Sequence, residues 1–187
     1  MRIGIDIDGV IANTFPLLVQ ELNNFFDKDL SYDDIVSYDL AKLYNVNQEQ
    51  LKEFAQAKRN LLYDGPLPVP YAVDCINNWR DKAYVALISA RFEMAREPTQ
   101  KWLERYNFYW NELILLGSHD KADTCVQMKL DIFIEDNLNN ALQVSSRGIP
   151  VILLDAPYNR APLSDQVRRV QSWSQICKII ALDIPSY

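Results

Sequence analysis

Histidine is nearly absent from this chain, since His119 is the only one among 187 residues. A catalytic triad with a histidine base, or a zinc site with several histidine ligands, has almost no residues from which to form. The three cysteines, Cys75, Cys125 and Cys177, are odd in number and far apart, without the close pairing of a metal site. We expect buried thiols in a reducing compartment, for which the cytoplasm is the default.

The chain also lacks the features of proteins that bind membranes or nucleic acid polymers. It has no long uncharged apolar run that could span a membrane, and its first residues lack the hydrophobic middle of a signal peptide. The formal net charge is −6, whereas a protein that binds a nucleic acid backbone normally carries a basic face. A small phosphorylated substrate is still compatible with this charge, because one lysine and one metal ion can reverse the local field.

Short apolar runs alternate with segments of helical spacing along most of the chain. The apolar runs predict strands over 2–8, 83–88, 112–116, 132–134 and 150–154. The segments between and after them predict helices over 71–82, 98–107, 121–129, 138–147 and 173–182. Alternation of this kind implies right-handed crossovers and an α/β, Rossmann-like fold, with a mostly parallel sheet flanked by helices.

One segment interrupts this alternation. Helical spacing predicts helices over 15–26 and over about 47–62, with one short helix between them in 28–40. The proline-rich stretch 63–70 suits neither a helix nor a strand interior, and it reads as a return linker. We therefore predict an α/β core made of residues 1–13 and 67–187, with a small helical cap inserted over 14–66.

The first predicted strand ends in two carboxylates that are two residues apart, Asp6 and Asp8. Carboxylates so close repel each other unless a cation or a shared proton intervenes, and a hard divalent ion such as Mg²⁺ is the natural partner. Gly9 suits a tight turn in which the backbone approaches a ligand closely. For this stretch alone, a solvated Asp-Gly turn at the end of a strand is the alternative.

Reactive side chains also follow three later strands: Ser89 and Arg91 the second, Lys121 the third, and Glu135 and Asp136 the fourth. The carboxyl ends of parallel strands lie at one edge of a sheet, so these groups can converge with the first acidic pair. Phosphoryl transfer to a carboxylate needs a nucleophile, a second carboxylate as acid and base, and cations around the phosphoryl oxygens. The predicted set supplies each of them.

The order of these motifs resembles that of the haloacid dehalogenase (HAD) superfamily. Its first motif, Asp-x-Asp-x-Val/Thr, is matched by DIDGV at 6–10, and its second by Ser89 in LISAR. Its third is matched by Lys121, and its fourth by the acidic pair that ends IFIED. The first motif is fairly specific, whereas the other three gain weight from their order.

Over nearly its whole length the chain looks like the 5′(3′)-deoxyribonucleotidase family of cytosolic type C. The likeness is carried by DIDGVIAN, LPVPYAVDCINNW, KWLERYNF, HDK and a late SW pair. It implies a Mg²⁺-dependent phosphatase for small phosphate monoesters, above all nucleoside monophosphates. The oligomeric states considered include a homodimer.

The resemblance also implies a role for each motif residue. Asp6 would be the nucleophile and a metal ligand, and Asp8 the general acid and base, with its backbone carbonyl on the metal. Asp136 would be the remaining protein ligand of the metal. Ser89 and Lys121 would hold the phosphate.

Residues near the motifs have less defined roles. Glu135 is expected to orient Lys121 or a metal-bound water rather than to bind the metal directly. Arg91 is expected either to clamp the phosphate or sugar of the substrate or to pair with a carboxylate of the cap. Thr14 stands where the eukaryotic nucleotidases place an aromatic residue that stacks on the base, and Phe15 directly after it is the candidate for that contact.

The insertion is rich in aromatic residues, most of which must fill the interior of a small helical bundle. A minority are expected to face the site, where an aromatic ring can stack on a base. The aromatic residues are Phe15, Phe25, Phe26, Tyr32, Tyr38, Tyr44, Phe54 and Tyr63.

Three other functions are considered. One is a HAD phosphatase for another small substrate such as a sugar phosphate. Another is a phospho-receiver or similar regulatory module, although receivers usually have a contiguous acidic pair and no inserted cap. The last is a HAD-like protein without activity, against which stands the presence of all four motifs.

Overall fold

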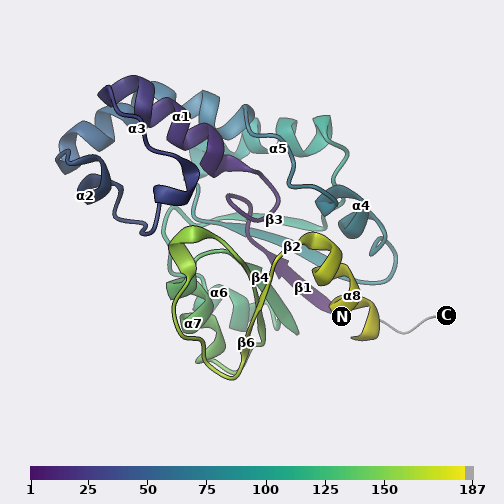
Figure 1. Cartoon of the computed structure of the whole chain (residues 1–187). Helices are drawn as coiled ribbons and strands as arrows, with labels where there is room; N and C mark the ends of the chain where they lie inside the picture. Colours follow the sequence, from purple (N-terminus) through teal and green to yellow (C-terminus); the bar gives the residue numbers. More distant parts are fainter. Residues whose placement is uncertain (184–187) are drawn as a thin grey trace.

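The computed structural model describes residues 1–183 and contains a six-stranded parallel sheet (Figure 1). Its strands are β1 (Arg2–Ile5), β2 (Tyr84–Ser89), β3 (Glu112–Leu115), β4 (Ile132–Glu135), β5 (Val151–Leu154) and β6 (Val167–Val170). Their order across the sheet is β3-β2-β1-β4-β5-β6, and all neighbours are parallel. The predicted Rossmann-like fold is confirmed.

Two details of the sheet differ from the prediction. The strand expected over 2–8 ends at Ile5, because the chain then turns sharply and the carbonyl of Ile7 accepts N–H groups from residues 10–12. The strand β6 was not predicted. Its sequence, VRRV, has no apolar run, and it lies at the edge of the sheet, where polar side chains are tolerated.

Helices cover both faces of the sheet. They are α4 (Ala72–Asn77), α5 (Arg96–Arg105), α6 (Ala122–Gln127), α7 (Leu138–Ser145) and α8 (Trp173–Asp183), with 3₁₀ helices η2 (Glu93–Ala95) and η3 (Pro157–Asn159). Alternate strand residues point to opposite faces. Ile3 and Ile5 therefore join a core cluster with Trp173, whereas Ala86 and Phe133 join a second cluster. Within residues 1–183, none of the helices has both the length and the apolar character needed to cross a membrane.

The segment that interrupts the alternation lies beside the carboxyl edge of the sheet (Figure 1). Its elements are α1 (Thr14–Phe26), η1 (Tyr32–Asp34), α2 (Leu40–Tyr44) and α3 (Gln48–Asp64), and we call residues 14–66 the cap. Its core includes Leu22, Ile35 and Phe54. The two long helices were predicted. The short helix predicted in 28–40 is the 3₁₀ helix η1, with the capping box of Ser31 and Asp34, whereas α2 was not predicted.

Two adjacent strand-like segments connect the cap to the sheet. The N–H of Asn13 donates to the carbonyl of Leu67 at 2.8 Å, and the N–H of Val69 donates to that of Ile11 at 2.8 Å. Trp102 in α5 supports the second segment by donating its Nε1–H to the carbonyl of Pro66 at 2.7 Å. The chain therefore leaves and rejoins the core at one place, next to the loop that carries the first acidic pair.

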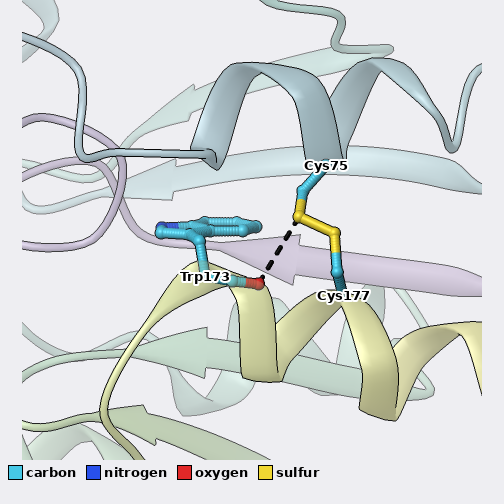
Figure 2. The surroundings of a disulfide bond; sticks show 3 residues. All are labelled: Cys75, Trp173 and Cys177. Atoms are coloured by element: carbon cyan, nitrogen blue, oxygen red, sulfur yellow. Dashed lines mark hydrogen bonds between the residues drawn. A yellow bond between two sulfur atoms is a disulfide. The ribbon is translucent and has the colours of Figure 1, made fainter.

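A disulfide joins Cys75 in α4 to Cys177 in α8, which lie 102 residues apart in sequence (Figure 2). The expectation of buried thiols is therefore wrong for these two residues, whereas Cys125 is free and buried as predicted. The two helices pack side by side and bring the Cα atoms to 5.7 Å, a distance typical of disulfides. Sequence spacing alone does not reveal such a contact.

Candidate active site

The carboxyl edge of the sheet gathers the predicted motif residues. Asp6 follows β1 directly, Ser89 is the last residue of β2, and Glu135 is the last residue of β4. The parallel register pairs Ile5 with Leu87, so the ends of the two strands lie at nearly the same level. The three polar residues are buried, which is unusual for such groups unless they are paired or bind a ligand.

The loop after β1 is a tight turn built around one carbonyl group. Ile7 O accepts the N–H groups of residues 10, 11 and 12 at 3.3, 3.0 and 2.9 Å. Gly9 has a φ of 81°, and a Cβ atom added there would lie 2.1 Å from Oδ2 of Asp136. Only glycine therefore permits this approach of the backbone to Asp136, and the tight turn expected at Gly9 is present, whereas a close approach to a ligand stays a prediction.

Lys121 lies between two carboxylates. Its Nζ is 2.7 Å from Oδ1 of Asp6 and 2.9 Å from Oε2 of Glu135, and its side chain is almost fully buried. Burial alone would lower the pKa of this lysine, but the two carboxylates outweigh it and raise the pKa. The structure thus brings the third motif against the first and fourth and keeps a positive charge there.

Both carboxylate oxygens of Glu135 accept hydrogen bonds from other protein groups. Its Oε1 accepts the N–H groups of Asp136 and Asn137 at 3.0 Å each. Its Oε2 accepts from Lys121 and from Nδ2 of Asn140 at 3.3 Å. Burial opposes ionisation, but Lys121 and the N–H donors hold the pKa of Glu135 below its usual value. This geometry supports the expected role in orienting the lysine.

Asp136 accepts two tyrosine hydroxyls on the same oxygen. Tyr158 O–H donates to Oδ2 at 2.5 Å, and Tyr38 O–H, from the cap, donates to Oδ2 at 2.8 Å. Burial raises the pKa of Asp136 well above its usual value, and the charges of Glu135 and Asp6 raise it further. The carboxylate is thus oriented through one oxygen, while the other is left for a different partner.

The residues at this edge fit a divalent cation. Within residues 1–183, the buried Oδ1 of Asp136 has no hydrogen-bond partner, and Oδ1 of Asp6 contacts Nζ of Lys121. Oxygens of Asp6, Glu135 and Asp136 lie within 4.8 Å of one another. Burial raises the pKa of Asp6 to about 8, although Lys121 opposes this rise. Carboxylates crowded in this way favour either a bound proton or a hard cation with oxygen ligands.

Asp8 is held by an arginine and a threonine. Arg91 donates Nε–H to Oδ2 and Nη2–H to Oδ1, both at 2.8 Å, and Thr14 donates its hydroxyl to Oδ1 at 2.7 Å. Burial alone would raise the pKa of Asp8, but Arg91 and Thr14 outweigh it and lower the pKa. The expected pairing of Arg91 with a cap carboxylate is wrong, since its partner lies in the core. Contact of Arg91 with substrate stays a prediction.

An aromatic cluster of Phe15, Tyr32, Tyr38 and Tyr158 stands beside Asp136. The ring of Phe15 lies 4.3 Å from that of Tyr158 and 5.6 Å from that of Tyr38. Phe15 is only 7% exposed, whereas Tyr38 is 37% exposed. The cap therefore brings aromatic faces to the acidic edge, and a stacking contact of Phe15 with a base stays a prediction.

Sequence reasoning did not identify Tyr158 and Asn159 as site residues. Tyr158 donates to Asp136, and Nδ2 of Asn159 donates to the backbone carbonyl of Asp136 at 2.7 Å. Both lie in η3, just beyond the carboxyl end of β5. The strand-end rule that located the other motifs would have flagged this loop as well. His119 is exposed.

A parallel sheet whose carboxyl edge holds this acidic site, with a helical insertion after the first strand, defines a protein with a HAD-like fold. The model of the family "5' nucleotidase, deoxy (Pyrimidine), cytosolic type C protein" matches residues 1–184. The chain belongs to this family. The predicted family and enzyme class are confirmed, and the regulatory-module alternative is wrong.

Individual relatives agree with this assignment. The Bacillus subtilis protein YqfW, provisionally designated a nucleotidase, is 32% identical over 176 residues, which are 92% of this chain and 90% of that protein. A 5'(3')-deoxyribonucleotidase of the same species is 26% identical over 93% of this chain and 95% of its own length. YfnB of B. subtilis, provisionally designated a HAD-hydrolase and solved with bound magnesium, has a TM-score of 0.66 at 12% identity. That match covers 96% of this chain and 97% of YfnB, and it supports the fold alone.

Proposed function

We propose that this protein is a Mg²⁺-dependent phosphatase that acts on small phosphate monoesters through an aspartyl-phosphate intermediate. The proposed substrates are nucleoside monophosphates, so the protein would be a 5′(3′)-(deoxy)nucleotidase. The family assignment and the relatives support the substrate class. The observation that carries the chemistry is the crowding of buried carboxylates around Lys121: oxygens of Asp6, Glu135 and Asp136 lie within 4.8 Å of one another, and within residues 1–183 Oδ1 of Asp136 has no hydrogen-bond partner.

In the first half-reaction, a carboxylate oxygen of Asp6 attacks phosphorus and the bond to the leaving oxygen breaks. Asp8 gives its proton to that oxygen. In the second half-reaction Asp8 takes a proton from water, which attacks phosphorus and releases phosphate, so that Asp6 is regenerated. Lys121 and the hydroxyl of Ser89 stabilise negative charge on the phosphoryl oxygens throughout.

Three groups would hold the metal: the carboxylates of Asp6 and Asp136 and the backbone carbonyl of Asp8. A bound Mg²⁺ neutralises charge on the phosphoryl oxygens and keeps the carboxylates from repelling the substrate. Glu135 would act through Lys121 rather than on the metal, since its oxygens already accept four N–H contacts.

We assign residues 14–66 as a cap domain over a core formed by residues 1–13 and 67–183, and the last four residues of the predicted core, 184–187, lie outside the described residues. The cap would exclude water during transfer and open for product release. Phe15 would lie against the base, supported by its place in the aromatic cluster.

The proposed location is the cytoplasm, in keeping with the cytosolic type named for the family. The Cys75–Cys177 disulfide would be uncommon there, because disulfides in that compartment are usually transient.

A substrate screen tests this function. Nucleoside 5′- and 3′-monophosphates and sugar phosphates are assayed with Mg²⁺ and with a chelator. We expect Mg²⁺-dependent phosphate release, with nucleotides preferred over sugar phosphates. Asp6→Asn should abolish turnover with the fold intact, whereas Asp74→Asn, an exposed position on α4, should behave as wild type. Preference for sugar phosphates would contradict the nucleotidase, and full activity of Asp6→Asn would contradict the nucleophile.

A further inference from the structure

We propose that Arg91 is a positioning residue, which holds the carboxylate of Asp8 in the orientation from which Asp8 exchanges protons with the leaving group and with water. This inference rests on the proposed function, in which Asp8 is the general acid and base. It gives Arg91 a role through Asp8 rather than through the substrate.

The contact between Arg91 and Asp8 fixes direction as well as distance. Two N–H groups of the guanidinium meet the two carboxylate oxygens, both at 2.8 Å. A contact with one oxygen would let the carboxylate rotate, whereas this side-on pairing aligns the two planar groups. The carboxylate of Asp8 is 31% exposed, so without these partners it would be free to turn toward water.

Arg91 is itself held from several sides. Its Nη1 donates to Oγ1 of Thr99 at 2.9 Å, and Thr99 is fully buried in α5. Its guanidinium carbon lies 4.8 Å from the centre of the Tyr63 ring. Its backbone N–H donates to Oγ of Ser89 at 3.2 Å. The side chain is therefore a fixed support, with most of its five N–H groups already engaged.

The same cluster reaches both ends of the cap. Thr14 is the first residue of α1, and its hydroxyl lies 2.7 Å from Asp8. Tyr63 stands near the end of α3, and its ring packs on Arg91. The orientation of Asp8 is thus set where the two connecting segments join the core. A clamp on the substrate would instead need free guanidinium N–H groups, whereas those of Arg91 donate to Asp8 and Thr99.

The test compares two substrates in the full-length protein with Mg²⁺. A nucleoside monophosphate releases an alkoxide that needs a proton, whereas p-nitrophenyl phosphate releases a stable anion that does not. Arg91→Ala should lower kcat for the nucleotide by about 100-fold and kcat for the aryl ester by only about tenfold. KM should stay within about threefold of wild type, because substrate binding is not touched.

Two further measurements separate positioning from a general structural role. Added guanidinium ion should restore part of the kcat lost in Arg91→Ala. Arg91→Lys should recover little, because an ammonium cannot make two parallel contacts. Arg96→Ala is the matched control, since Arg96 lies in the same segment and pairs with the exposed Glu93. It should leave both substrates as in wild type.

Thr14→Val keeps the inference testable if Arg91→Ala does not fold. It removes the other hydrogen bond to Asp8 and should lower the ratio of nucleotide to aryl-ester kcat by about three- to tenfold. Thr14→Ser, which keeps the hydroxyl, should retain the wild-type ratio. Thermal melts establish which variants are folded.

Several outcomes would overturn the proposal. A raised KM with unchanged kcat in Arg91→Ala would show that Arg91 binds the substrate. A raised kcat would show that Arg91 hinders proton exchange by Asp8 instead of supporting it. An unchanged ratio in folded Arg91→Ala and Thr14→Val would refute positioning while leaving the phosphatase intact. If the wild-type chain hydrolyses no phosphate monoester, the proposed function fails, and the role of Arg91 falls with it.

Discussion

Tyr158 donates its hydroxyl to Oδ2 of Asp136 over 2.5 Å, so the loop after β5 orients a carboxylate at the end of β4. Neighbours that orient a metal ligand often change metal affinity when they are removed. Tyr158→Phe keeps the ring in the aromatic cluster but loses this hydrogen bond. We expect the Mg²⁺ concentration for half-maximal activity to rise by about tenfold. Tyr71→Phe, at a largely exposed position, is the control, and an equal Mg²⁺ requirement in both variants would contradict the role.

Asp8→Asn should slow both half-reactions, because the amide can neither give a proton to the leaving oxygen nor take one from water. The loss in kcat should be about 100-fold or more for a nucleoside monophosphate and smaller for p-nitrophenyl phosphate. Steady-state rates on the two substrates measure the difference. Equal losses on both would argue against Asp8 as the acid.

Mg²⁺ should stabilise the protein more as the pH rises. Burial raises the pKa of Asp6 from 3.8 to about 8, and it raises that of Asp136 as well. Without metal, the folded state then binds more protons than the unfolded chain between about pH 4 and 8, so its stability falls across this window. Mg²⁺ binds the deprotonated carboxylates and adds about 2.7 kcal/mol at 100 times its Kd.

Melting temperatures with chelator and with Mg²⁺ at pH 6, 7 and 8 measure this effect. The Mg²⁺-induced increase should be largest at pH 8 and should disappear in Asp136→Asn. The exposed substitution Asp74→Asn should retain it. An increase that does not change with pH would show that the metal does not compete with protons at these carboxylates.

Reduction of the Cys75–Cys177 disulfide should destabilise the fold. The bond closes a loop spanning 102 residues, and disulfides typically contribute about 2–4 kcal/mol. A reducing agent should lower the melting temperature of the wild type and leave that of the Cys75→Ala/Cys177→Ala double variant unchanged. Thiol titration in denaturant should count one free thiol, Cys125, before reduction and three after it. Three thiols before reduction would contradict the disulfide.

The parts of this fold that follow local rules were predictable from sequence. β2 is a continuous apolar run because helices cover both faces of the sheet, and such runs locate strands directly. Once the strands are placed, parallel pairing forces their carboxyl ends to one edge. That single constraint is enough to bring Lys121 to Asp6 across more than a hundred residues.

The parts that depend on tertiary contacts were not predictable. Nothing local to Arg91 indicates that its partner is Asp8, because the ion pair forms only when the segment after β2 meets the loop after β1. The disulfide requires α4 and α8 to be neighbours, which is a property of the whole topology. β6 has a weak signal because an edge strand needs little apolar surface.

The paired connecting segments have a consequence for how such an enzyme diversifies. Because Asn13 and Leu67 are hydrogen-bonded to each other, the two ends of the cap lie almost at one point. An insertion with adjacent ends can be lengthened, shortened or exchanged for another without shifting the register of the strands. The cap can therefore change in length and sequence during evolution, and with it the range of substrates, while the residues at the carboxyl edge of the sheet stay the same.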